Sequence, residues 1–166
     1  MKTFRVCLIL LPVCALLIGV APMMRSTSAD NLSAATNQEL AQARNATAKY
    51  HNVATAEADG YVFVGCVPGE GLEYVNFSLI DCNFDIEHPE ALHYMNEGNG
   101  LRLVGVEYVV PIVCTPTAPP EGFTGDADEW EFMAEGLPIW NLRAALWLPN
   151  ANGMFGEDNP RVPACP

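Results

Sequence analysis

The chain has 166 residues, of which 20 are Asp or Glu and 8 are Lys or Arg, so its net charge is −12 at neutral pH. A surface this acidic repels the phosphates of nucleic acids and the headgroups of anionic lipids, which excludes both as partners. The chain shows no internal repeat, and residues 30–166 are long enough for one domain with its own hydrophobic core.

Residues 1–29 are predicted to be a secretory signal peptide. Lys2 and Arg5 precede an apolar stretch from residue 6 to residue 20, and STSA at 26–29 offers a small-residue cleavage site. Two alternatives stay open: lipidation at Cys14, where the preceding Val is unlike a lipobox, and an uncleaved anchor, for which the stretch is short. We therefore expect a secreted or periplasmic protein, with no stable membrane insertion after cleavage of the signal peptide.

A helix from about residue 34 to residue 58 is the first predicted element of the domain. Its apolar stripe, at helical spacing, consists of Leu40, Ala43, Thr47, Tyr50 and Ala54. Gly60 suits the left-handed residue that ends a helix. We expect the stripe to pack on a sheet.

Downstream the hydrophobic period changes from that of a helix to that of a strand. Strand-like stretches follow at residues 61–67, 72–80, 91–95, 101–110 and 142–148. The NEGNG between the third and fourth stretches is a hairpin turn signal. The order predicts an α+β fold, with one N-terminal helix packed on a mainly antiparallel sheet of four to five strands.

A long polar segment, residues 115–138, precedes the last strand and is predicted to form a flap over one side of the sheet. Its acidic run consists of Asp126, Asp128, Glu129, Glu131 and Glu135. Carboxylates so spaced can chelate calcium, but the run lacks the Gly and the terminal Glu of an EF-hand, which favours a solvated acidic loop. Presented to a basic partner, the same loop would make the domain an interaction module.

Glu107 is the acidic residue in the middle of the strand LRLVGVEYVV, residues 101–110. Leu103, Gly105 and Val109 share its face at the spacing of a strand. The carboxylate therefore points into an apolar row. Either this row lines a site, or a partner neutralises the charge.

The three histidines, His51, His88 and His93, differ in their settings. His51 is expected on the solvent side of the helix and His88 in a turn. His93 lies on a strand face and is expected to be a packed histidine rather than a ligand or a catalytic base.

Motifs of common enzymes are missing from the sequence. It contains no GxSxG, no HExxH and no Gly-rich loop between a strand and a helix, which excludes the corresponding hydrolases, zinc proteases and nucleotide-binding proteins. Glu73 and Glu107 are the pair of carboxylates placed on predicted strands, so they are the candidates for carboxylate-based catalysis. Whether the protein is an enzyme stays open.

Four stretches of the chain are distinctive: KYHNVATAEADGYV, YVN after a Gly-rich turn, HPEALHYMNEGNGLRLVGVEYVVP and LPNANGMFGEDNPRVPAC. They resemble a family of small secreted proteins of bacteria and some fungi. The resemblance covers roughly residues 46–165 and implies no established activity.

The resemblance does imply a polar constellation. The family pattern has His at the positions of Glu73 and Arg143 and Glu at that of Glu107, a set that suits a divalent transition metal. Since both imidazoles are replaced here, we expect a pocket in which Arg143 holds Glu107 or Glu73 by paired hydrogen bonds, with Asn76 nearby. Glu73 and Glu107 are the candidate ligands for a divalent metal, with the Asn76 amide oxygen as a further ligand for calcium.

Four cysteines remain after the signal peptide: Cys66, Cys82, Cys114 and Cys165. Their even number and the absence of CxxC favour two disulfides in an oxidising compartment, with three pairings open from the residues alone. The resemblance implies Cys66 with Cys165, which leaves Cys82 with Cys114. The tail would then be a strap fixed by Cys165.

The sequence thus predicts a secreted or periplasmic ligand-binding or structural domain whose partner is an unknown small molecule or protein. Its candidate pocket consists of Glu73, Asn76, Glu107 and Arg143. The alternative is a metal-dependent or carboxylate-based enzyme that uses the same pocket. No cofactor is expected, and a divalent metal is the one alternative.

Overall fold

A computed structural model of the protein describes residues 32–134 and 136–165, so the predicted signal peptide lies outside the described residues. Within those ranges the helical segments are α1 (Ala34–Thr47), η1 (Ala48–His51) and α2 (Val53–Ala58). The strands are β1 (Val62–Val67), β2 (Gly71–Val75), β3 (Ala91–Asn96), β4 (Leu101–Pro111), β5 (Glu131–Met133) and β6 (Ile139–Ala144). None of the helices described has the length and apolar character needed to cross a membrane.

The predicted helix 34–58 is divided into three consecutive segments. Ser33 begins α1, because its hydroxyl oxygen accepts a hydrogen bond from the backbone N–H of Thr36. Asn52 has an extended backbone, and its side chain accepts from the N–H of Ala54, so it begins α2 as a new N-cap. The periodicity alone did not distinguish this cap from a residue inside one helix.

The strands described form one antiparallel sheet in the order β1-β2-β3-β4-β6-β5. The α+β class and the antiparallel sheet are confirmed, but the sheet has six strands instead of the predicted four to five. The additional strand, β5, belongs to the predicted flap.

Two strand boundaries also differ from the prediction. The predicted strand 72–80 ends at Val75, because the Asn76 side chain accepts hydrogen bonds from the backbone N–H and the hydroxyl of Ser78 and forms a turn. The last strand is Ile139–Ala144 rather than 142–148, because the backbone turns where the N–H of Leu146 bonds to the carbonyl of Ala144.

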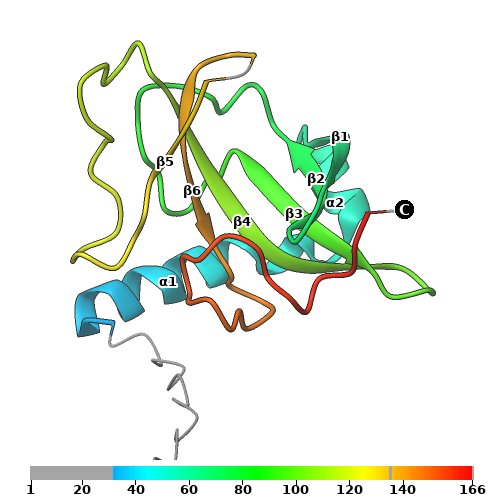
Figure 1. Ribbon diagram of the computed structural model, residues 1–166. Helices are drawn as coiled ribbons and strands as arrows, with labels where there is room; N and C mark the ends of the chain where they lie inside the picture. The colour runs from blue at the N-terminus through cyan, green and yellow to red at the C-terminus, as the bar shows by residue number, and fades with distance from the viewer. Residues whose placement is uncertain (1–31, 135, 166) are drawn as a thin grey trace, which may run out of the picture.

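The helical segments cover one face of the sheet, here called the helix side (Figure 1). The central residues of its core are Leu40, Ala43, Tyr50, Tyr74, Leu92, Tyr94, Val106, Tyr108 and Leu142. Tyrosine hydroxyls join this core to the surrounding backbone: that of Tyr94 donates to the carbonyl of Tyr50, and that of Tyr61 to the carbonyl of Pro89. The buried hydroxyls are thereby satisfied.

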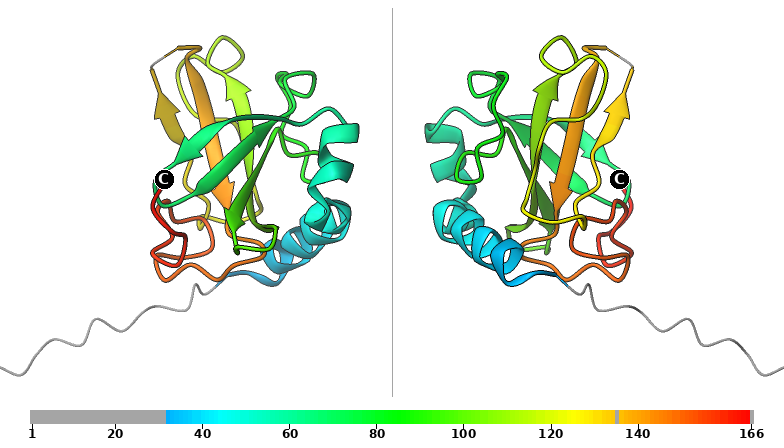
Figure 2. Two further views of the ribbon diagram at one scale, coloured as in Figure 1. Left: turned by 90° about the vertical axis from the view of Figure 1, so that its right-hand side faces the viewer. Right: turned by 90° about the vertical axis from the view of Figure 1, so that its left-hand side faces the viewer.

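The opposite face, here called the pocket side, is concave. β1 and β5 lie at the two ends of the strand order, yet side chains from both line the same pocket. The sheet must therefore curl about this face, and Figure 2 shows both edge strands turned away from the helices.

The segment 115–138 packs through its first half on the helix side. Phe123 is buried, with its ring against those of Phe84 and Tyr108. The backbone N–H and the hydroxyl of Thr124 both donate to Glu39 on α1. The predicted flap therefore has two parts, one bound to the helix and one that adds an edge strand to the sheet.

Both predicted disulfides, Cys66–Cys165 and Cys82–Cys114, are confirmed. The first closes a loop with a sequence separation of 99 and attaches the end of the chain to β1. A loop of that size stabilises the fold by roughly 4 to 5 kcal/mol in the chain-entropy model. Residues 149–165, the C-terminal strap, are also held by the N–H of Asn159, which donates to the carbonyl of Gly69.

Candidate functional site

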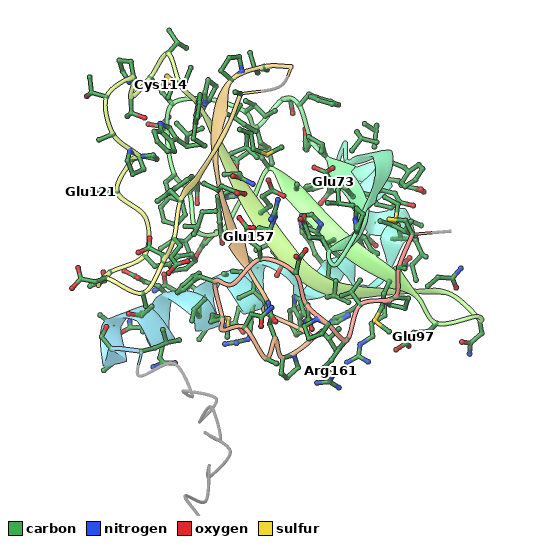
Figure 3. The ribbon with its side chains drawn as sticks, viewed as in Figure 1. Glu73, Glu97, Cys114, Glu121, Glu157 and Arg161 are labelled. Carbon is green, nitrogen blue, oxygen red and sulfur yellow. A yellow bond between two sulfur atoms is a disulfide. The ribbon has the colours of Figure 1, made fainter. Side chains whose placement is uncertain are left out.

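The register of the sheet brings four ionisable side chains to the pocket side. Glu73 on β2 pairs with His93 on β3, and Glu107 on β4 pairs with Arg143 on β6. His93 and Glu107 are two rungs apart on the neighbouring strands β3 and β4, since His93 pairs with Gly105. Figure 3 views the sheet from this side and labels Glu73 on β2.

Glu107 is buried, with 4% of its surface exposed, and its nearest partner is His93. The distance from His93 Nε2 to Glu107 Oε2 is 2.8 Å, and because a carboxylate only accepts, Nε2 is the donor. Arg143 Nε lies 3.6 Å from the same oxygen. Glu107 is thus buried and ion-paired with Arg143, as predicted, but the predicted paired hydrogen bonds from Arg143 are wrong, because His93 makes the hydrogen bond to Glu107.

The charges of this pair follow from its contacts. Burial by itself raises the pKa of Glu107, but the hydrogen bond from His93 and the charges of His93 and Arg143 outweigh it, so the pKa lies below its ordinary value. Burial likewise lowers the pKa of His93, but the hydrogen bond to Glu107 and its charge raise the net value. The two residues form a buried ion pair.

Glu70 belongs to this group and was not predicted. It comes from the turn between β1 and β2, and its Oε2 lies 2.9 Å from Arg143 Nε and 3.8 Å from His93 Nδ1. Burial raises the pKa of Glu70 to about 7, against the opposing charges of Arg143 and His93. We call Glu70, His93, Glu107 and Arg143 the charged cluster.

The position of Glu70 depends on the glycines on either side of it. Gly69 and Gly71 have φ angles of 79° and 105°, which other residues rarely adopt. A Cβ on Gly71 would lie 2.3 Å from the carbonyl oxygen of Tyr94. An acidic residue between two glycines, in a turn joining two strands, is the sequence signal that could have revealed Glu70.

Three atoms of the charged cluster have no aligned hydrogen-bond partner among the described residues: Glu70 Oε2, His93 Nδ1 and Arg143 Nε. The 2.9 Å contact between Arg143 and Glu70 is thus an ion pair without good hydrogen-bond geometry. At its outer end, Arg143 Nη1 lies 4.0 Å from Glu157 of the C-terminal strap.

A metal ion is one occupant that the distances would allow. Ligand atoms of Glu70, His93 and Glu107 lie within 4.8 Å of one another, and no other such group is found in residues 32–134 and 136–165. The guanidinium of Arg143, however, contacts both glutamates and already supplies a positive charge between them. Since it would repel a cation at that point, the arrangement favours the ion-paired cluster over a metal centre.

A pocket of about 320 Å³ opens beside the charged cluster on the concave face. We call its polar part, made of Glu70, Glu73, Glu107 and Arg143, the pocket floor. The walls are apolar and consist of Val64, Val67, Val75, Phe77, Ile80, Val109, Met133, Leu137 and Ile139. A second cavity of about 40 Å³, which Glu70, His93 and Arg143 also line, is too small for an organic ligand.

Glu73 differs from the other charged residues of the pocket floor. It is only partly buried and forms no ion pair or hydrogen bond with another residue in the described part of the chain. Burial and the charge of Glu107 raise its pKa, while His93 and Arg143 act in the opposite direction. Its carboxylate is therefore available to a molecule in the pocket.

Asn76 lies outside the pocket, which corrects the prediction that it belongs to the site. Its amide nitrogen donates to the carbonyl of Asp59, and its oxygen accepts from Ser78. The side chain therefore joins the end of α2 to the turn after β2, and its oxygen is not placed beside Glu73 and Glu107 for calcium.

In the acidic run of the predicted flap, the carboxylate of Asp128 accepts a hydrogen bond from the backbone N–H of Phe123, and Glu135 is outside the described residues.

Comparison of the chain with protein-family models, with curated proteins and with solved structures gave no match. The resemblance to a family of small secreted proteins therefore stays a prediction. The geometry of the pocket and the charges within it are the features that bear on the function of this protein.

Proposed function

We propose that this protein is a secreted or periplasmic ligand-binding domain whose concave pocket holds a small, largely apolar molecule with one polar end. The observation that carries the proposal is the pocket of about 320 Å³ with apolar walls and a charged floor. Small-molecule sites commonly have volumes of roughly 300–1,000 Å³, with mostly apolar linings and a few polar groups that fix orientation.

The rim of the pocket supports binding rather than a purely structural role. Several apolar side chains that line the pocket are exposed to solvent: Phe77 by 63%, Leu137 by 60% and Val64 by 44%. Exposed apolar residues gathered around a concavity are typical of a binding site, because leaving them in water is otherwise unfavourable. A ligand would cover them.

The compartment is part of the proposal and is supported by the two disulfides, which persist in oxidising environments. N-terminal sequencing of the exported protein tests it. We expect the mature chain to begin near Asp30, and an intact N-terminus on exported protein would contradict cleavage.

The binding function can be tested with a pair of matched variants. Val64→Trp places a large ring at the mouth of the pocket, whereas Val113→Trp makes the same change at a residue that is 80% exposed and does not line the pocket. A diverse fragment library is screened against the wild type by thermal shift. We expect fragments that stabilise the wild type and Val113→Trp but not Val64→Trp. A library without hits, or hits that bind both variants equally, would contradict the proposal.

Acid–base catalysis in the same pocket is a second candidate, favoured by one observation. Glu70 lines the pocket and has its pKa raised by burial to about 7, so it can both give and take a proton near neutral pH. Turnover of a bound molecule that is lost in Glu70→Gln, while binding of that molecule persists, would support catalysis. Equal turnover in the wild type and the variant would exclude this role for Glu70.

A further inference from the structure

When its glutamates are ionised, the charges around the pocket do not balance. Glu107 is paired with His93, and Glu70 with Arg143, at 2.8 and 2.9 Å respectively. Glu73 is left without an ion pair among the described residues, although it lies on the floor of a pocket whose walls are apolar. A carboxylate covered by an apolar ligand would lose its water without compensation, which is costly.

Resting on the ligand-binding function proposed above, we infer that the ligand carries a protonated amine and that Glu73 binds this amine at the pocket floor. An ammonium group supplies the missing positive charge and up to three hydrogen-bond donors. The apolar remainder of the ligand then packs against the walls of the pocket.

The same geometry disfavours an anionic ligand. Arg143 is the cation of the pocket floor, and its guanidinium already faces Glu70, Glu107 and Glu157 at distances from 2.9 to 4.0 Å. A carboxylate or phosphate on the ligand would have to displace one of these partners and approach Glu73. The net charge of −12 on the chain adds a long-range attraction for cations.

A neutral polar ligand is also disfavoured relative to an amine. An alcohol could donate one hydrogen bond to Glu73 but would leave its charge uncompensated in a partly apolar site. The preference should therefore depend on the charge of Glu73 and not on its size. Glu73→Gln, which keeps the shape of the side chain, removes the charge alone.

The test uses two sets of probes on the full mature chain. One set is hexylamine, 1-hexanol and hexanoate; the other is 2-phenylethylamine, 2-phenylethanol and 3-phenylpropanoate. Dissociation constants are measured by calorimetry or by NMR titration. We expect the amines to bind about tenfold more tightly than the alcohols, which is the value of one charge-assisted hydrogen bond, and the carboxylates most weakly.

The variants separate recognition by Glu73 from general electrostatics. Glu73→Gln should weaken amine binding about tenfold and leave alcohol binding unchanged, whereas Glu73→Asp should keep part of the preference. Glu97→Gln is the matched control, because Glu97 is an exposed carboxylate paired with Arg102 and does not line the pocket. It should leave all six dissociation constants unchanged.

The outcomes distinguish this inference from the function on which it rests. Alcohols that bind the wild type as tightly as amines, or a preference for amines that persists in Glu73→Gln, would overturn the inference and leave the binding function intact. If no probe binds the wild type, the amine inference fails. The binding function fails only if the fragment library also gives no hit that Val64→Trp abolishes. The comparison of amine with alcohol in the wild type requires no variant to fold.

Discussion

The two faces of the sheet bury their polar groups in different ways. On the helix side, the buried hydroxyls of Tyr61, Tyr94 and Tyr108 are neutral, and each donates to a backbone carbonyl. On the pocket side charged groups are buried together with the neutral Asn141, and three atoms of the charged cluster lack an aligned partner among the described residues. The helix side is a neutral core in which only the indole N–H groups of Trp130 and Trp147 lack a partner among the described residues. The pocket side instead keeps charged groups in an arrangement that stability alone would not select.

This difference separates the side of the sheet that stabilises the fold from the side that contains the pocket. Well-packed neutral groups on the helix side, together with two disulfides, stabilise the fold. This stability offsets the cost of burying charges beside a cavity on the pocket side. The variants below separate the two faces, beginning with the largest expected effect.

Replacing His93 tests whether its ion pair with Glu107 stabilises the fold. His93→Leu leaves the buried charge of Glu107 with the amide of Asn141 and the more distant Arg143, and we expect a loss of about 3 kcal/mol in the free energy of unfolding. The double variant His93→Leu/Glu107→Leu removes both charges and should recover most of that loss. Urea denaturation measures both. A single variant as stable as the wild type would mean that the pair contributes nothing.

A pair of substitutions in β4 compares the packing of the two faces directly. Val106 lies in the core on the helix side, whereas Val109 lines the pocket. Val106→Ala creates a new cavity and should cost about 2 kcal/mol, while Val109→Ala enlarges an existing cavity and should cost less than about 1 kcal/mol. Equal losses in chemical denaturation would show that the pocket side is packed as tightly as the helix side.

Replacing Arg143 tests whether its guanidinium excludes metal from the charged cluster. Arg143→His removes the competing charge and adds an imidazole next to Glu70, His93 and Glu107, so we expect Co²⁺ to bind at least about tenfold more tightly than to the wild type. The absorption spectrum of bound Co²⁺ measures this. Arg102→His, at an exposed arginine paired with Glu97, is the control and should gain nothing. Tight stoichiometric binding by the wild type would contradict the exclusion.

The pH dependence of stability should show the smallest effect. Because burial raises the pKa of Glu70 to about 7, the folded state holds this proton more tightly than the unfolded state, where an ordinary Glu has 4.5. The contribution of Glu70 to stability is therefore complete below pH 4.5 and decreases as the pH rises towards 7. Relative to Glu70→Gln, the wild type should lose on the order of 1 kcal/mol across that interval. A constant difference between the two would mean that the pKa of Glu70 is not raised.

Local patterns in the sequence were sufficient for the class of the fold and for the anomaly at its centre. The change from helical to strand period predicted the helical region and the strands on which the site lies, since these patterns depend on neighbouring residues. The isolated Glu107 in an apolar row indicated either that the row lines a site or that a partner neutralises the charge. The even number of cysteines indicated two disulfides, although their pairing was implied by the resemblance and not by the residues.

The partners within the site were decided by the tertiary structure alone. Periodicity assigns each residue a face, but strand order and register, which depend on residues far apart in the chain, decide what lies opposite it. His93, in addition to the predicted Arg143, was therefore found to hold Glu107, and Glu70 reaches the site from a turn. Asn76 lies outside the site because its side chain forms a local turn with Ser78. The pocket itself arises from the curl of the sheet, which brings both edge strands to one concavity and which no single stretch of the sequence encodes.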